Sequence, residues 1–137
     1  MRNFLSALIF LSLTFVGCSS QSISTVVAPS VKTLSADQLK RVVETDPGIV
    51  LVDVRTKGEI ERDGTIKGFI HIPLSQVDKR LSEIPKDKKI VVVCSHGARS
   101  ARAASILLSR GYKDVYAAGM LDYMAKGYPL VYPKLRE

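Results

Sequence analysis

The chain has 137 residues, of which 46% are hydrophobic, and its 20 Lys and Arg exceed its 13 Asp and Glu to give a formal net charge of +7. This length favours one domain with a buried core over several domains. The positive charge favours anionic partners such as lipid headgroups or small anionic substrates. Nucleic acid is a poor candidate because the chain has no basic and aromatic motif of the kind that binds it.

The first 17 residues have the pattern of an export signal. Arg2 provides the positive start, and the run from Phe4 to Val16 is almost wholly apolar. This run is too short to span a bilayer comfortably, and a polar stretch rich in Ser and Thr follows it directly. We predict a signal peptide over residues 1–17, with a buried N-terminal helix as the alternative.

Phe15-Val16-Gly17-Cys18 resembles the lipobox of bacterial lipoproteins, with Phe15 where that family usually has Leu. The resemblance implies that Cys18 is lipidated and anchors the protein without a membrane-spanning helix. Ser19 stands where an Asp would retain a lipoprotein at the inner membrane of enteric bacteria, so the outer membrane is favoured. We expect an exported protein at the periplasmic face of a bacterial membrane. Conventional cleavage to a soluble periplasmic protein stays open.

The composition changes after the lipobox. Residues 18–32 are mostly small and polar and predict a flexible tether, and the folded domain is expected over residues 33–137. The two cysteines of the chain are Cys18 and Cys94. If lipidation occupies Cys18, Cys94 is the single thiol of an exported domain and a candidate for reactivity. A disulfide between the two and an inert, buried Cys94 are the alternatives.

Strand-like and helix-like segments alternate along the predicted domain. Short apolar, β-branched runs predict buried strands, and capped or amphipathic segments between them predict helices. Strands are expected at residues 49–52, 69–72, 90–93 and 115–116. Helical segments are expected at residues 35–46, 56–62, 74–84, 101–110 and 120–125. This alternation predicts an α/β fold with a mainly parallel central sheet and helices on both faces.

Sites in such sheets form at the carboxyl ends of the strands, and a cysteine lies at one of these ends. The apolar run Ile90 to Val93 leads directly into Cys94-Ser95-His96-Gly97-Ala98-Arg99-Ser100. The amides of this loop and of the next helix are expected to point at the sulfur and to stabilise the thiolate, which is the nucleophile. Gly97 allows a positive φ, and Ser100 suits the helix N-cap.

Other polar residues could serve this loop. Arg99 could bind an anion or lock the loop through a carboxylate. Asp53 and Arg55, which follow an earlier strand, either support the loop or form a purely structural ion pair. His96 is expected to face solvent or an anionic substrate, with a general base as the alternative. No metal site is predicted because the histidines and the thiol lack ligand spacing.

The pattern Cys94-x-x-Gly97-x-Arg99-Ser100 is similar to the active-site loop of single-domain rhodaneses, which are sulfurtransferases. Asp53-x-Arg55 resembles an Asp-x-Arg of that family, and the resemblance extends from about Thr33 to Pro133. Further matching positions are Glu59, Gly64, Ile66, Gly68, Ile72-Pro73, Gly111-Tyr112, Val115, Gly119, Gly127 and Pro129. The chain departs from the family pattern at Thr65, Phe69, His71 and Tyr123, where His, Ala, Asn and Trp are common.

The resemblance implies a rhodanese-like α/β fold and a two-step reaction without a metal or an organic cofactor. Cys94 would take the outer sulfur of a donor such as thiosulfate and carry it as a persulfide to a thiophilic acceptor such as cyanide or a thiol. The loop residues Ser95, His96, Gly97, Ala98, Arg99 and Ser100 would bind the anionic donor and stabilise the persulfide. The physiological donor and acceptor, a possible protein thiol partner included, and the oligomeric state stay open.

Three other functions remain as alternatives. Related phosphatases also use a loop from Cys to Arg, but with five intervening residues, whereas four separate Cys94 from Arg99. Non-catalytic rhodanese-like binding modules often lack the cysteine that this chain retains. A periplasmic persulfide carrier would use the same cysteine.

Overall fold

The computed structural model describes residues 30–136, which form a five-stranded sheet in the order β1-β5-β4-β2-β3. Every pair of neighbouring strands is parallel. The central strand β4 is buried along its whole length, which explains its continuous apolar sequence, since a parallel strand covered on both faces has no solvent side. The strands are β1 (Lys32–Leu34), β2 (Val50–Asp53), β3 (Ile70–His71), β4 (Ile90–Cys94) and β5 (Val115–Gly119).

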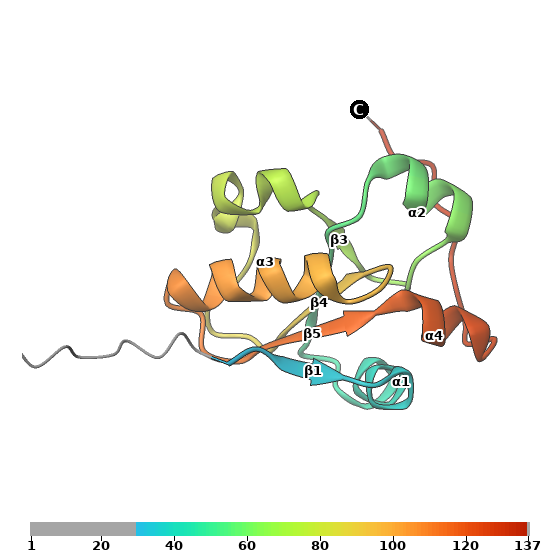
Figure 1. The fold of residues 1–137 in the computed structure, drawn as a ribbon, viewed down its shortest axis with the longest axis horizontal. Helices are drawn as coiled ribbons and strands as arrows, with labels where there is room; N and C mark the ends of the chain where they lie inside the picture. The colour runs from blue at the N-terminus through green and yellow to red at the C-terminus, as the bar shows by residue number, and fades with distance from the viewer. Residues whose placement is uncertain (1–29, 137) are drawn as a thin grey trace, which may run out of the picture.

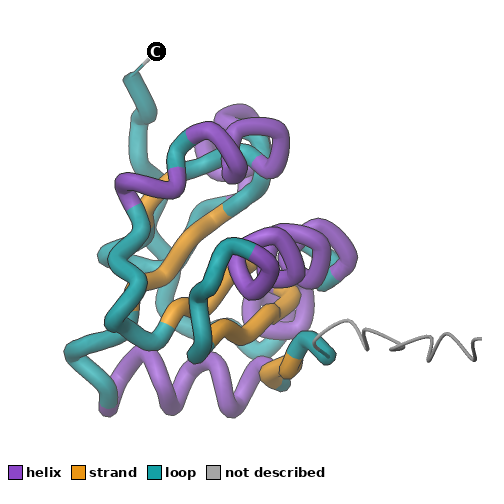
Figure 2. The backbone as a smooth tube through the Cα atoms, turned by 90° about the vertical axis from the view of Figure 1, so that its left-hand side faces the viewer, coloured by secondary structure: helices purple, strands orange, loops and turns teal. Residues whose placement is uncertain are grey.

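Helices cover both faces of this sheet, as predicted (Figure 1, Figure 2). α1 (Ala36–Thr45) and α4 (Met120–Ala125) pack on one face. α3 (Ala98–Ser109) and the 3₁₀ turns η1 (Leu74–Lys79) and η2 (Leu81–Glu83) pack on the other. α2 (Lys57–Asp63) connects β2 to β3.

The hydrophobic core has two halves because successive side chains of β4 point to opposite faces. Ile90, Val92 and Cys94 belong to the cluster under α3, and Val91 and Val93 belong to the cluster under α1 and α4. The sulfur of Cys94 therefore lies on the α3 side of the sheet.

The structure differs from the sequence-based expectations in three local details. β1 was not predicted, because its three residues carry little apolar pattern and it joins the sheet through backbone pairing with β5; it includes Lys32, the last residue of the predicted tether. The helical segment expected at residues 74–84 forms two 3₁₀ helices, which are separated at Arg80, where the chain leaves helical geometry (φ −118°). α3 begins at Ala98 because Gly97 forms the N-cap, so Ser100 lies inside the first turn.

The predicted signal peptide, Cys18 and most of the predicted tether lie outside the described residues. Within residues 30–136, no helix has the length and apolar character needed to cross a membrane.

Leu107 tests the core under α3. Its side chain is fully buried, so Leu107→Ala leaves a cavity and is expected to lower the free energy of unfolding by about 2–5 kcal/mol. Urea titration followed by circular dichroism measures this loss. Leu121, on the helix α4 and 44% exposed, is the matched control, and Leu121→Ala is expected to change stability by no more than about 0.5 kcal/mol. Equal effects of the two changes would contradict this packing.

Candidate active site

Cys94 ends β4 and is almost fully buried, with 1% of its surface exposed. Two backbone N–H groups donate to its Sγ, from Gly97 at 3.1 Å and from Ser100 at 3.3 Å. Both groups lie at the N-terminal end of α3, where the helix dipole adds positive potential. This geometry stabilises negative charge on the sulfur or on an atom bonded to it.

Two glycines allow the chain to pass so close to the sulfur. Gly97 has φ +100°, a backbone conformation that side chains with a Cβ rarely adopt. At Gly119, the last residue of β5, a Cβ would lie 3.2 Å from the carbonyl oxygen of Ser95 and from the carbonyl carbon of His96. The Ser100 hydroxyl completes the contact with β5, because it can donate to the carbonyls of Gly97 (2.8 Å) and Ala118 (3.0 Å).

Arg99 braces the loop against α2. Its guanidinium donates to both carboxylate oxygens of Glu59, at 2.9 and 2.6 Å, and to the Ser95 hydroxyl at 3.1 Å. Glu59 also accepts from the backbone N–H and hydroxyl of Thr56, which form the capping box of α2. Hydrogen bonding to Arg99 holds the pKa of Glu59 well below its usual range, and the same contact raises the pKa of Arg99. The sequence suggested that Arg99 either binds an anion or locks the loop through a carboxylate. The contacts observed are those of the second role.

Asp53 and Arg55 form a fully buried ion pair, with Arg55 Nη2 2.7 Å from Asp53 Oδ2. The same Nη2 donates to the carbonyl of Gly64 at 2.8 Å, and the Thr65 hydroxyl donates to Asp53 at 2.8 Å. Arg55 and Gly64 flank α2, so the pair holds both ends of the helix that carries Glu59. Within residues 30–136 neither side chain bonds to the Cys94 loop, and their support of it is indirect. Arg55 Nη1 is buried without a hydrogen-bond partner in this region.

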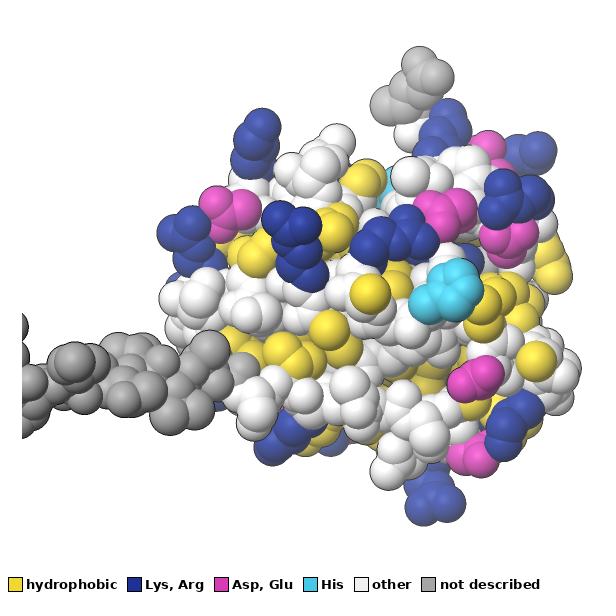
Figure 3. All heavy atoms as spheres, viewed as in Figure 1, with side chains coloured by type: hydrophobic (Ala, Val, Ile, Leu, Met, Phe, Trp, Pro, Cys, Tyr) yellow, Lys and Arg dark blue, Asp and Glu magenta, His cyan; other side chains and the backbone are white. Residues whose placement is uncertain are grey.

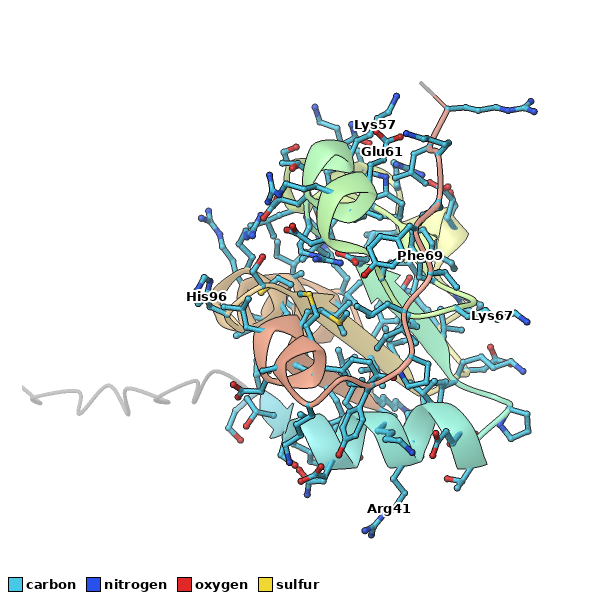
Figure 4. The ribbon with its side chains drawn as sticks, turned by 90° about the vertical axis from the view of Figure 1, so that its right-hand side faces the viewer. Arg41, Lys57, Glu61, Lys67, Phe69 and His96 are labelled. Carbon is cyan, nitrogen blue, oxygen red and sulfur yellow. The ribbon has the colours of Figure 1, made fainter. Side chains whose placement is uncertain are left out.

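Neither histidine forms a hydrogen bond with the Cys94 sulfur within residues 30–136. His96 is exposed and points outward from the loop (Figure 4). His71 lies in β3, where its Nε2 is 2.9 Å from the Arg55 carbonyl. No group of His, Cys, Asp and Glu side chains in residues 30–136 is arranged to hold a metal ion.

Ala98 is exposed at the start of α3, and hollows flank the loop on two sides. A hollow of about 210 Å³ is lined by His96, Gly97, Gly119 and Asp122 among others. A second, of about 530 Å³, is lined by Arg99 and the residues after β2 and β3. The Cys94 side chain is buried and lines neither hollow.

Sequence reasoning missed three contributors to the site. Glu59 was noted as a family match but not as the partner of Arg99, which is 40 residues away. Thr65 was treated as a departure from the family pattern, whereas its hydroxyl satisfies the buried Asp53. Gly119 was not linked to the loop, because only the packing of β5 brings them together. For Glu59, the one signal available in the sequence was its capping-box spacing from Thr56, which indicates the start of a helix.

Comparisons with known proteins agree with this geometry. A sequence profile for the rhodanese-like domain matches residues 35–125. A sulfurtransferase from Allochromatium vinosum is 33% identical over 106 residues, which cover 76% of this chain and 98% of that protein. A thiosulfate sulfurtransferase from Pseudomonas syringae is 35% identical over 85 residues, covering 61% of this chain and 79% of that protein. The crystal structure of a rhodanese-related protein from Thermoplasma volcanium matches with a TM-score of 0.66 and 29% identity, over 74% of this chain and 99% of that one.

The ion pair between Glu59 and Arg99 predicts a pH-dependent contribution to stability. Because the folded state lowers the pKa of Glu59, this contribution is present above the ordinary glutamate pKa of about 4.3 and is lost as the pH falls below it. The side chains of Arg99 and Glu59 are 35% and 21% exposed, so Glu59→Gln is expected to lower the free energy of unfolding at pH 7 by about 1–2 kcal/mol. Urea titrations between neutral and acidic pH should show the two proteins converging as the pH falls.

Glu83→Gln is the matched control, since Glu83 pairs with Arg80 on the surface, three residues away. It is expected to cost less than about 1 kcal/mol. Wild-type and Glu59→Gln curves that stay parallel down to low pH would contradict the assignment.

Proposed function

Because this chain belongs to the rhodanese-like domain family, we propose that it is a sulfurtransferase in which Cys94 carries the transferred sulfur. The observation that carries the proposal is the pair of N–H groups, from Gly97 and Ser100, that donate to the Cys94 sulfur at the start of α3. The similar protein named a thiosulfate sulfurtransferase supports thiosulfate as the donor.

In the first step, the Cys94 thiolate attacks the outer sulfur of thiosulfate. The S–S bond of thiosulfate breaks, sulfite leaves with the bonding electron pair, and Cys94 becomes a deprotonated persulfide. The N–H groups of Gly97 and Ser100 stabilise the thiolate before this step and the persulfide after it. In the second step, a nucleophilic acceptor such as cyanide or a thiolate takes the outer sulfur and Cys94 returns to the thiolate.

The braced loop favours sulfur transfer over phosphate hydrolysis. Four residues separate Cys94 from Arg99, which suits a single sulfur atom better than a tetrahedral oxyanion. The guanidinium of Arg99 is also occupied by both oxygens of Glu59, whereas a phosphate-binding arginine must offer two N–H groups to its substrate.

The intact mass of the purified protein tests the proposal. After incubation with thiosulfate, the wild type is expected to gain one sulfur atom, and cyanide is expected to remove it. Cys94→Ala is expected to gain none, and Ser105→Ala, on the exposed side of α3, is the control that keeps the wild-type response. An unmodified wild type at high thiosulfate would exclude this donor, and an unmodified wild type with polysulfide as well would support the binding-module alternative.

The same proposal includes export and anchoring. The positive, apolar first 17 residues and the lipobox-like Phe15-Val16-Gly17-Cys18 support a lipidated Cys18 at the periplasmic face of a bacterial membrane, with the outer membrane favoured. The segment of small polar residues that follows supports a flexible tether between the anchor and the domain.

Processing can be measured on the protein expressed in a Gram-negative host. The mature wild type is expected in the membrane fraction, with an intact mass that corresponds to a chain beginning at an acylated Cys18. Cys18→Ser is expected to block this processing because the acylated thiol is absent, while Ser19→Ala leaves it unchanged. A mature chain without an acyl group, recovered in the soluble periplasmic fraction, would contradict anchoring and support conventional cleavage.

A further inference from the structure

The chain continues beyond α4 as a C-terminal segment, residues 128–136, that returns across the molecule to α2 (Figure 1). It lies outside the match to the rhodanese-like profile, which ends at residue 125. Within it, Val131 forms an isolated antiparallel bridge with Thr65, and the N–H of each residue donates to the carbonyl of the other at 2.8 Å. The segment is therefore attached to the chain just after the end of α2.

Two more contacts join the C-terminal segment to α2. The Tyr132 ring lies against Gly64, the C-cap of the helix, where a Cβ would be 2.9 Å from Tyr132 Cε1. The N–H of Leu135 donates to the Glu61 carboxylate at 2.8 Å. The segment thus contacts α2 and the residues that follow it at three points.

α2 depends on such contacts because it has little apolar packing. Ile60 is the one residue of α2 that is buried, and it belongs to neither half of the hydrophobic core. Charged side chains of both signs cover the outer surface around α2 (Figure 3). The position of α2 is therefore set mainly by polar contacts, and the C-terminal segment supplies part of them.

The residues that the C-terminal segment holds also hold the buried ion pair. The Thr65 hydroxyl donates to Asp53, and Arg55 donates to the Gly64 carbonyl, each at 2.8 Å. Thr65 is fully buried, so its bridge to Val131 fixes the hydroxyl from which Asp53 accepts. Movement of the segment would therefore disturb the ion pair and the C-terminal end of α2 together.

α2 in turn carries the brace of the cysteine loop. Glu59 accepts from Arg99, and it also accepts from the Ser95 hydroxyl at 3.2 Å. Ser95 and Arg99 lie on either side of Gly97 in the chain, and the Gly97 N–H donates to the Cys94 sulfur. A shift of α2 would therefore displace the N–H groups that face the sulfur.

We propose that the C-terminal segment positions the N–H groups that face the Cys94 sulfur, by holding Thr65 and α2. It acts through other residues, since within residues 30–136 it forms no hydrogen bond with residues 94–100. The proposal concerns the geometry of the loop and goes beyond the proposed sulfur transfer. Contacts in series establish coupling only when changes at the two ends are non-additive, which a double-mutant cycle measures.

NMR of the purified, isotope-labelled protein tests the proposal through the amide proton shifts of Gly97 and Ser100. These shifts report hydrogen bonding in the folded state, so a loss of overall stability does not move them. Val131→Pro removes the N–H that donates to Thr65 and is expected to move both signals upfield, because their hydrogen bonds to sulfur weaken. Val131→Ala keeps this N–H and is the matched control. The amides of residues 104–109 in α3 should not move in either variant.

Thr65 tests the same route without a proline. Thr65→Val removes the hydroxyl that donates to Asp53 at a similar side-chain volume, and it is expected to move both amide signals in the same direction. Thr65→Ser keeps a hydroxyl and should restore the wild-type positions. Signals that stay at their wild-type positions in both Val131→Pro and Thr65→Val would overturn the proposal.

A double-mutant cycle with Glu59→Ala tests whether the effect passes through α2. Glu59→Ala removes the brace itself, so adding Val131→Pro is expected to move the Gly97 and Ser100 signals no further. Shifts that add in full would overturn the proposal, because the effect would then bypass α2. The measurement needs no sulfur donor, so a protein that takes up no sulfur from thiosulfate would contradict the proposed function and leave this result unchanged.

Discussion

The site depends on how quickly the chain turns from β4 into α3. Only Ser95, His96 and Gly97 separate Cys94 from the first residue of the helix, so the amides at the start of the helix are brought against the sulfur. This short turn requires the φ of +100° at Gly97, and it requires Gly119 to present no side chain to the loop. The geometry of the site thus follows from a backbone constraint more than from any side chain other than that of the cysteine.

A chain of buried and half-buried polar contacts keeps this loop in place. Asp53 and Arg55 are charges that burial would make costly if they were unpaired, and they offset that cost by bonding to each other and by joining the two ends of α2. α2 then presents Glu59 to Arg99. Such a series of contacts fixes the positions of the amides, which is the condition under which hydrogen-bond donors stabilise a negative charge most effectively.

The use of Arg99 as a brace changes how anions can be recognised. A guanidinium bonded to a carboxylate has little capacity left for another anion. The described chain also enters the fold at the amino end of β1, which lies opposite the carboxyl ends of the parallel strands where Cys94 is found (Figure 1).

The sequence by itself determined the α/β class, the parallel sheet and the position of Cys94 at a strand end, because apolar runs such as Ile90 to Val93 and capping boxes such as the one at Ser35 are local signals. It also identified Gly97 as a residue that permits a tight turn. It did not determine β1, whose formation depends on pairing with β5, or the start of α3, which the conformation of Gly97 decides. Only the tertiary structure paired Glu59 with Arg99 and placed Gly119 against the loop, since these contacts join residues far apart in the chain and depend on how the layers pack.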